Sequence, residues 1–503
     1  MKSTDQLIIH LILIIKKSTM KKSIFLLTLL ISSTITIHAQ KKAISPNIVL
    51  ILMDDMGYGD LSSYGALNIS TPNIDQLASE GIRFTNYVSP QAVCSASRAG
   101  LLTGCYPNRI GISGAFMPNS PVGISASEIT IAELLKQKNY TTAIVGKWHL
   151  GDSKEFLPLQ HGFDEYFGLP YSNDMWPVDF DGKPVNETHR KARFPILSLI
   201  KNNEPYQEIR TLEDQATITG KYTDEAIKFI KKNKQHPFFL YLAHSMPHVP
   251  INASKAFRGA SKQGLYGDVI QEVDNAIGQI LKTLKEQGLE DNTMVIFTSD
   301  NGPWLAFGNH AGSAGGFREG KGTSFEGGQR VPFIIKWNKS IPKNKICNQL
   351  IAGIDIFPTI AEICQLKLPT NKIDGISFNA ILKGDLNASP RKNFAYYYKR
   401  NSLEAVRRDS WKLVFAHPSR SDLNVLPGLN GFPGPTPENI NMPYALYDLR
   451  RDPSEAYDVK ELYPEIVKEL NEFAKTVRTD LGDDLQNMAG QNLRSIGKIT
   501  PKK

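Results

Sequence analysis

The sequence predicts an α/β fold, with a central, mostly parallel sheet flanked by helices and a smaller C-terminal α+β subdomain. Continuous apolar runs at residues 46–53, 238–243 and 293–299 are typical of strands that are buried on both faces of a sheet. Amphipathic helical segments separate these runs along the chain, as connections between parallel strands require. From about Asn393 the pattern changes to short strands and turns, which indicates the separate subdomain.

The remaining elements follow from hydrophobic periodicity and from helix start and stop signals. Two further strands of the central sheet are expected at residues 141–145 and 331–336. Helices are expected at residues 71–77, 129–138, 267–287, 354–364 and 461–478. In the subdomain, short strands are expected at residues 394–397, 411–415 and 445–448, with a long irregular loop at residues 418–443.

The first 39 residues have the features of a signal peptide. Met20, Lys21 and Lys22 open a basic segment, residues 24–31 form a short apolar core, and Ala39 ends a stretch that resembles a cleavage site. The true start of the protein is expected at Met20, and the apolar core is too short to span a bilayer. We therefore expect an exported protein, periplasmic or secreted, with no membrane anchor.

Charge and cysteine content narrow the classes of partner and fold. The formal charge is +8, and residues 1–39 carry five lysines and one aspartate, so the exported chain carries about +4. This charge is compatible with a polyanionic substrate, and no nucleic-acid partner is expected. Four cysteines are too few for a disulfide framework. Cys347 and Cys364 could pair, whereas Cys105 is expected to be buried and free.

A cysteine precedes a short predicted helix near residue 95. Ser95 and Ser97 are natural N-cap residues, and Gly104 is a plausible C-terminal stop. Cys94 is therefore expected at a helix N-terminus, where backbone N–H groups favour an anionic substrate group. Arg98 lies about one turn further on and can reach back towards it. The alternative is a buried, inert cysteine beside a capped helix.

The spacing Cys-x-Ala-Ser-Arg-x-x-Leu-Leu-Thr-Gly, which begins at Cys94, resembles the signature of type I, formylglycine-dependent sulfatases. The resemblance implies that Cys94 is oxidised after translation to formylglycine, whose hydrated aldehyde attacks the sulfur of a sulfate ester. The commonest form of this motif has proline where this chain has Ala96. The alanine form occurs in bacterial members, and the sequence does not identify the maturing enzyme.

Hard oxygen ligands follow two of the predicted strands. Asp54 and Asp55 come directly after the strand at residues 46–53, and Asp300 and Asn301 follow the strand at residues 293–299. The carboxyl ends of strands are where α/β folds place their ligands. An all-oxygen set suits Ca²⁺ or Mg²⁺ and argues against a zinc site. The alternative is a pair of solvated turns.

Cationic or protonatable side chains follow other strands and loops. They are Lys147, His149, His248 and Lys321, and Arg98 adds a fifth. Each residue alone is as compatible with a surface or structural position. Together they could hold a tetrahedral anion and stabilise charge on its oxygens.

The resemblance to type I sulfatases extends over about residues 46–457. The blocks that start at Asp54, Gly146, Ser299 and Gly320 fall in the order found in that family. Residues 161–164 and 168–172 are most similar to the branch that contains arylsulfatase A and N-acetylgalactosamine-6-sulfatase. The resemblance implies an alkaline-phosphatase-like fold, a catalytic domain at residues 40–390 and a C-terminal subdomain at residues 391–503.

The resemblance also implies a role for each site residue. Asp54, Asp55, Asp300 and Asn301 would hold Ca²⁺, with Mg²⁺ as the weaker alternative, joined by the modified Cys94. Lys147, Lys321 and His248 would hold the sulfate, and His248 would protonate the leaving alcohol. His149 would deprotonate the second hydroxyl of the hydrate, and Arg98 would orient it. The implied partners are a sulfated glycan or other sulfate ester and, transiently, the formylglycine-maturing enzyme.

Substrate choice is expected to lie in three segments, residues 171–176, 304–318 and 418–443. The first two combine aromatic side chains with hydrogen-bonding groups, the mixture that a sugar pocket needs. The candidate substrate-binding residues there are Asn173, Asp174, His310 and Arg318. Two other functions stay open: a phosphomonoester or phosphonate hydrolase of the same superfamily, and a non-catalytic binder of sulfated glycans.

Overall fold

The computed structural model describes residues 8–18, 20 and 45–499, and the chain divides into the units Met1–Ser45 and Pro46–Lys503. In the first unit, residues 8–18 and Met20 are helical, with exposed side chains. The predicted signal-peptide features at residues 21–39 lie outside the described residues. Within the described part of the chain, no helix combines the length and apolar character needed to cross a bilayer.

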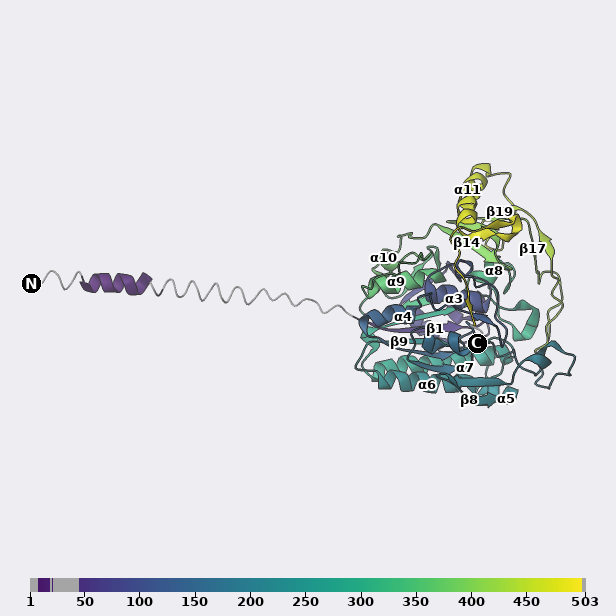
Figure 1. Cartoon of the computed structure of the whole chain (residues 1–503), viewed down its shortest axis with the longest axis horizontal. Helices are drawn as coiled ribbons and strands as arrows, with labels where there is room; N and C mark the ends of the chain where they lie inside the picture. Colours follow the sequence, from purple (N-terminus) through teal and green to yellow (C-terminus); the bar gives the residue numbers. More distant parts are fainter. Residues whose placement is uncertain (1–7, 19, 21–44, 500–503) are drawn as a thin grey trace, which may run out of the picture. The chain divides into compact units, whose positions relative to one another are not determined.

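The second unit is built on a ten-stranded mixed sheet (Figure 1). Across the sheet, the strands are β12 (Lys345–Cys347), β2 (Ile82–Phe84), β11 (Phe333–Lys336), β10 (Thr293–Ser299), β1 (Asn47–Met53), β9 (Phe238–Ala243), β5 (Thr141–Gly146), β6 (Glu165–Gly168), β7 (Leu197–Lys201) and β8 (Glu204–Ile209). The five strands from β10 to β6 run parallel, and β11, β7 and β8 pair antiparallel with their neighbours. The predicted α/β class and its mostly parallel centre are confirmed.

Helices cover both faces of this sheet because its central strands are apolar on both faces. In β1, alternate side chains enter two separate cores: Ile48 and Leu50 enter one, and Val49 and Ile51 enter the other. The first core also contains residues of α3 (Cys94–Thr103), α4 (Ile131–Leu135), α9 (Ile356–Ile363) and α10 (Asn379–Leu382). The second contains residues of α2 (Pro72–Ser79), α6 (Ile218–Lys232) and α7 (Leu265–Glu286). Figure 1 shows α6 and α7 below the sheet and α3, α4 and α9 above it.

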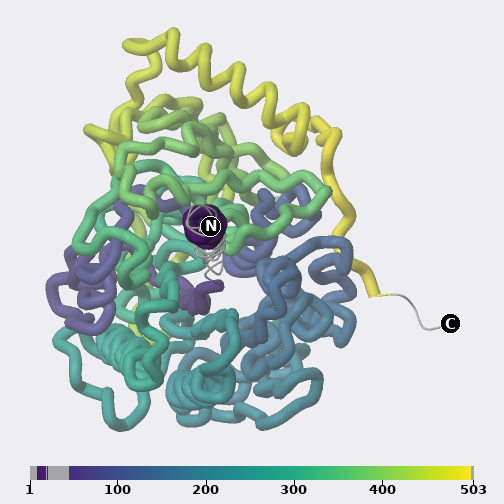
Figure 2. The backbone as a smooth tube through the Cα atoms, turned by 90° about the vertical axis from the view of Figure 1, so that its left-hand side faces the viewer, coloured from purple at the N-terminus to yellow at the C-terminus, as the bar shows by residue number. Residues whose placement is uncertain are grey.

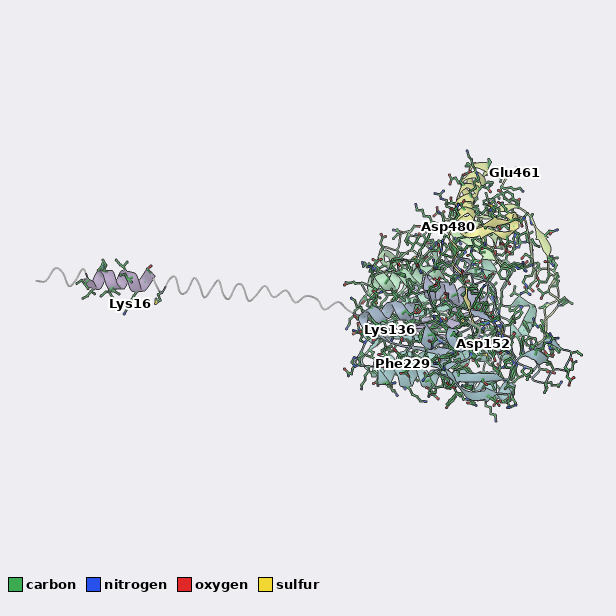
Figure 3. The ribbon with its side chains drawn as sticks, in the orientation of Figure 1. Lys16, Lys136, Asp152, Phe229, Glu461 and Asp480 are labelled. Atoms are coloured by element: carbon green, nitrogen blue, oxygen red, sulfur yellow. The ribbon has the colours of Figure 1, made fainter. Side chains whose placement is uncertain are left out.

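The C-terminal subdomain packs a helix on a small antiparallel sheet. The sheet contains β14 (Asn393–Tyr398), β15 (Ser402–Arg408), β16 (Trp411–Val414) and β19 (Ala445–Asp448), and the helix is α11 (Pro464–Leu481). Figure 3 shows Glu461 just before this helix and Asp480 near its end, beside the main body. There Arg109 binds both Asp374, at 2.6 Å, and Asp480, at 2.7 Å. The buried guanidinium thus ties α11 to the larger domain.

The chain returns to the larger domain after α11. Strand β22 (Gly497–Lys498) pairs with β4 (Val122–Gly123), and Figure 2 shows this last segment running down the side of the molecule. Short elements complete the connections: α5 (Leu212–Ala216), α8 (Glu326–Gln329), β3 (Tyr87–Val88), β13 (Ile351–Ala352), β17 (His417–Ser419), β18 (Ile440–Met442), β20 (Gly482–Asp483) and β21 (Met488–Ala489).

Two local expectations differ from the structure. Neither predicted serine caps α3; Val93 precedes the helix, and the Ser95 hydroxyl instead accepts a hydrogen bond from the Phe116 backbone N–H at 3.1 Å. Gly104 does end the helix in the left-handed conformation, as predicted. All four cysteines are free and buried, so Cys347 and Cys364 do not pair, and Cys105 is free as expected.

We expect acid to destabilise the fold through His161. Neither ring nitrogen has a partner in the described structure, the ring lies 6.0 Å from that of Trp148, and burial lowers the pKa of His161 from 6.5 to about 4. Between pH 6.5 and 4 the unfolded chain therefore binds a proton that the folded chain does not, so stability falls as the pH falls. The full difference is about 3 kcal/mol.

Unfolding curves measured from pH 7 to 4 for the wild type and for His161→Phe test this expectation. The variant keeps an aromatic ring beside Trp148 but has no proton to gain, so its free energy of unfolding should fall less steeply with acid. Identical slopes for the two proteins would contradict it.

Candidate active site at the carboxyl edge of the sheet

The register of β1 and β10 brings the predicted oxygen ligands together. The strands are parallel neighbours, and Met53 lies opposite Ser299, so the next residues emerge at the same edge. The Asp55 backbone N–H donates to Asp300 Oδ1 at 3.2 Å, and Asn301 Nδ2 donates to Asp55 Oδ1 at 2.7 Å. Asp55 adopts a left-handed conformation with φ of 63°, which turns the chain sharply at the end of β1.

This cluster fits a divalent cation. Asp54, Asp55, Asp300 and Asn301 are all buried, and Asn301 Oδ1 accepts no hydrogen bond from the described residues. A buried amide oxygen without a donor is costly, and a cation would satisfy it. Ligand atoms of Asp54, Asp55, Cys94 and His248 also lie within 4.8 Å of one another.

Cys94 is the first residue of α3 and faces the carboxylates. Its Sγ lies 3.5 Å from Asp54 Oδ1, and the side chain lines a pocket. Burial raises the pKa of the Cys94 thiol well above its usual range, and the nearby lysines do not offset this. The unmodified thiol is therefore protonated at neutral pH and is a poor nucleophile.

Arg98 holds the two strand ends in place rather than facing open space. Its Nε and Nη2 donate to Asp300 Oδ2 at 3.0 and 2.8 Å, and Nη1 donates to the backbone carbonyl of Lys147 at 2.8 Å. Nη2 also lies 3.4 Å from Asp54 Oδ2. The guanidinium thus connects α3 to β1, β10 and the end of β5.

Two lysines bind the two carboxylates of the Asp54–Asp55 pair. Lys147 Nζ contacts Asp54 Oδ2 and donates to Ser172 Oγ at 3.1 Å, and Lys321 Nζ lies 2.7 Å from Asp55 Oδ1. Burial opposes ionisation of Asp54, but Lys147, His248 and Arg98 together hold its pKa well below the usual range. Burial and the neighbouring Asp54 raise the pKa of Asp300 to about 7. A cation bound beside Asp300 would lower this pKa, because positive charge favours the ionised carboxylate.

The two predicted histidines present opposite ring nitrogens to the site. His248 Nδ1 donates to the Val249 carbonyl at 2.6 Å, so its Nε2 faces Ser172 Oγ at 3.4 Å and Asp55 Oδ2 at 3.6 Å. His149 Nε2 donates to the Phe116 carbonyl at 3.0 Å, which leaves its Nδ1 without a partner in the described structure. Burial lowers the pKa of both rings, and the lysines add to this effect.

Four of these side chains line a pocket of about 240 Å³: Cys94, His149, His248 and Lys321. The carboxylates of the cluster, Arg98 and Lys147 are not among its lining residues. The indole ring of Trp304 forms part of one wall, with its centroid 4.5 Å from Lys321 Nζ and 5.7 Å from the His248 ring. The lining residues are Val93, Cys94, Ala115, Met117, His149, Ser172, Asp174, Met175, Arg190, Phe194, His248, Trp304, Lys321, Tyr398 and Arg420. A larger groove, of about 960 Å³, lies along α11 and contains none of the predicted site residues.

The four predicted substrate-binding residues occupy different surroundings. Asp174 lines the pocket. Asn173 is buried beneath it, with Nδ2 directed at the carbonyls of His248, at 3.2 Å, and Pro250, at 3.3 Å. Arg318 donates to the Glu455 carbonyl at 2.9 Å and lies over Phe325.

His310, the fourth of these residues, is half-buried beside Gly431 of the 418–443 loop. Neither His310 nor Arg318 lines the pocket. Sequence reasoning did not name Ser172, Arg190, Tyr398 or Arg420, which do line it. Ser172 and Arg420 fall within the predicted segments 171–176 and 418–443, whereas Arg190 and Tyr398 fall outside them. Arg190 and Arg420 are basic side chains in irregular segments. The sequence does not show where such side chains lie, because the position of a loop depends on how the chain folds.

The fold and this edge of the sheet define a hydrolase with an alkaline-phosphatase-like architecture. Similarity to known protein families identifies the family. Residues 46–366 match the family model described as Sulfatase, and residues 389–499 match the C-terminal region of aryl-sulfatase. A model for the C-terminal part of N-sulphoglucosamine sulphohydrolase matches residues 318–416. The chain belongs to the sulfatase family, whose members hydrolyse sulfate esters.

Individual relatives cover most of the chain. The N-acetylgalactosamine-6-sulfatase of Canis lupus familiaris is 37% identical over 454 residues, 86% of this chain and 85% of the relative. The arylsulfatase A of Bos taurus is 35% identical over 449 residues, 86% of each chain. Among solved structures, the PsFucS1 sulfatase from Pseudoalteromonas sp. is 31% identical, with a TM-score of 0.77 over 86% of this chain and 89% of that one.

We expect Asn173→Ala to lower stability as well as activity. The change removes the donor for the His248 and Pro250 carbonyls and for Gln215 Oε1, which should cost about 1–3 kcal/mol of unfolding free energy. The loosened backbone should also lower kcat, because His248 is displaced.

Asn309→Ala is the matched control, since that exposed amide bonds, among the described residues, only to Asn430. Denaturant unfolding and steady-state kinetics measure both effects. Unchanged stability, combined with a raised KM for a glycan alone, would instead place Asn173 in contact with substrate.

Proposed function

We propose that this protein is an exported sulfatase that hydrolyses sulfate esters on poly- or oligosaccharides. The observation that carries the proposal is the surroundings of Cys94: a buried cysteine at a helix N-terminus, on the floor of a pocket, facing a carboxylate cluster and flanked by Lys147 and Lys321. A buried, protonated thiol has no evident use there, whereas the hydrate of a formylglycine at the same position would supply a hydroxyl nucleophile.

Ca²⁺ is the cation that the donor set favours. Asp54, Asp55, Asp300 and Asn301 would hold it through oxygen atoms, with the modified Cys94 adjacent to it. Mg²⁺ is disfavoured because it usually keeps several waters and demands near-ideal octahedral geometry. Bound Ca²⁺ would supply positive charge that polarises a sulfate oxygen.

The remaining side chains bind the sulfate and move protons. The ammonium groups of Lys147 and Lys321 face the carboxylate cluster beside Cys94, so a sulfate bound there would accept hydrogen bonds from both. Arg98, fixed by Asp300, would orient the nucleophile, whose proton Asp300 would help to remove.

The two histidines would transfer protons in different steps, His248 as the proton donor and His149 as the proton acceptor. His248 presents Nε2 to the pocket, 3.6 Å from Asp55 Oδ2. Burial and the lysines lower its pKa, so a proton held on Nε2 would pass readily to the leaving alcohol. His149 presents an unpartnered Nδ1, the acceptor that a general base needs. In this assignment His149 accepts the proton of the second hydroxyl of the hydrate, the C=O bond forms and the C–O bond to the sulfate breaks, so sulfate departs and the aldehyde is regenerated.

The proposal also covers the substrate class, the location and the maturation of Cys94. A sulfated glycan is supported by the relative named N-acetylgalactosamine-6-sulfatase and by the mixture of aromatic and polar side chains in the pocket. We propose that residues 1–39 direct export and are removed, that the catalytic domain ends near residue 390, and that a maturing enzyme oxidises Cys94.

Cys94→Ala should abolish turnover of an aryl sulfate, with a loss of at least about a thousandfold in kcat, because the nucleophile is removed. Peptide mass spectrometry of active wild-type protein should show the mass loss that accompanies conversion of the thiol to an aldehyde. Fully active protein with an intact thiol at Cys94 would overturn the mechanism. A matched aryl phosphate, measured in parallel, separates a sulfatase from a phosphomonoester hydrolase by the ratio of kcat/KM.

Ca²⁺ should stabilise the chelator-treated protein. At a concentration one hundred times its Kd, a ligand that binds only the folded state adds about 2.7 kcal/mol, which thermal unfolding detects without any activity measurement. Asn301→Leu should weaken binding and reduce this gain, because it removes the unpartnered amide oxygen.

Asn338→Leu is the matched control, because Asn338 also has a buried, unpartnered Oδ1 but lies outside the site. It should lower stability yet leave the Ca²⁺-dependent gain intact. Equal Ca²⁺ gains in the wild type and in Asn301→Leu would show that Asn301 is not a ligand.

A further inference from the structure

The rim of the active-site pocket contains a cation that the proposed chemistry does not use. Arg420, just after β17, lines the pocket together with Tyr398 and Lys321. In the proposed mechanism, Arg98, Lys147 and Lys321 contact the carboxylates or the sulfate. The Arg420 guanidinium has no role in that mechanism. Its side chain is 18% exposed, so most of it is withdrawn from bulk solvent.

The fold holds Arg420 beside the sulfate-binding lysine. Its neighbours Ser421 and Asp422 both bind the buried carboxylate of Glu319: Ser421 Oγ donates at 2.6 Å, and the Asp422 backbone N–H donates at 2.8 Å. Glu319 lies two residues before Lys321. The carboxylate therefore fixes the start of the Arg420 loop against the segment that carries Lys321.

A glycine makes room for the guanidinium at this place. Gly322 has φ of 83°, and a Cβ atom there would lie 2.9 Å from Arg420 Nη1 and 3.0 Å from the Tyr398 hydroxyl. A side chain at this residue would therefore displace both groups. Because Gly322 has no side chain, the Arg420 guanidinium and the Tyr398 phenol can approach the backbone at the residue that follows Lys321.

Arg420 keeps hydrogen-bond donors to spare. Within the described structure, its Nη2 donates to Glu438 Oε1 at 3.2 Å, whereas its buried Nε has no partner. The Glu438 side chain is 50% exposed, so this pair is weakened by solvent. A planar guanidinium with unused donors is suited to a carboxylate or sulfate group.

We infer that Arg420 recognises a second anionic group on the substrate, next to the sulfate ester that is cleaved. The inference rests on the proposed sulfatase function and narrows its substrate class to glycans with an adjacent carboxylate or a second sulfate. Arg190, exposed on the pocket lining and without an ion pair among the described residues, adds positive charge. Asp174 is the acidic side chain in the lining, and it comes from the segment that supports His248.

The test compares matched substrates in the wild type and in Arg420→Gln. The substrates are 6-sulfated N-acetylgalactosamine, its 4,6-disulfated form, and the 6-sulfated sugar linked to glucuronate or to glucuronate methyl ester. An aryl sulfate serves as the common reference. The wild type should prefer at least one anion-bearing substrate over its neutral match by tenfold or more in kcat/KM. The disulfated and glucuronate arms show which anion is recognised.

Arg420→Gln should reduce that preference by at least tenfold, and the loss should shrink as salt is added. Glu438→Gln is the control for a structural role, since it breaks the described ion pair but removes no cation, and it should leave the preference intact. Absence of any anion preference in the wild type, or an equal loss on all substrates in Arg420→Gln, would overturn the inference. Failure of the wild type to hydrolyse the aryl sulfate would instead count against the proposed function itself.

Discussion

The parallel register of β1 and β10 assembles the oxygen cluster of the candidate active site. Each strand ends in two oxygen-bearing residues, and because Met53 lies opposite Ser299, the four side chains emerge side by side. Two direct contacts lock the ends together: Asp55 N–H to Asp300 Oδ1, and Asn301 Nδ2 to Asp55 Oδ1. A shift of one residue would move one pair to the opposite face of the sheet and separate the ligands.

Three buried carboxylates so close together need compensating charge, and the neighbouring elements supply it. Arg98 reaches Asp300 from α3, Lys147 reaches Asp54 from the end of β5, and Lys321 reaches Asp55 from a loop. In the absence of a cation these contacts satisfy the carboxylates. In the proposed function Lys147 and Lys321 also hold the sulfate, so these two side chains would both stabilise the fold and bind the substrate.

The sequence is most informative where burial is complete. The runs that became β1, β9 and β10 are continuous and apolar, and the polar residues that follow them identify the sheet edge, so the chemical core of the site was predictable. Strand β15 was missed because its charged residues interrupt the apolar pattern of a strand. Helix α6 was missed although its apolar face, which includes Tyr222, Phe229 and Ile230, has helical spacing and was predictable. Arg420 lies in the loop at residues 418–443 that was expected to contribute to substrate choice, whereas Tyr398 could not be assigned to the pocket, since its position depends on how the subdomain packs.

The C-terminal subdomain is part of the active site rather than an appendage. The segment that carries Lys321 is held at both ends: Glu319 binds Ser421 and Asp422, and Glu326 binds Lys412 at 3.1 Å within a buried ion cluster. The subdomain therefore fixes Lys321, the lysine that we propose to bind sulfate, and also places Arg420 and Tyr398 on the pocket lining. The sheet sets the positions of the side chains at the strand ends. The packing of the C-terminal subdomain on the larger domain sets the positions of the side chains on the pocket rim. Changes in the rim can consequently alter which sulfate ester fits without disturbing the register that assembles the oxygen cluster.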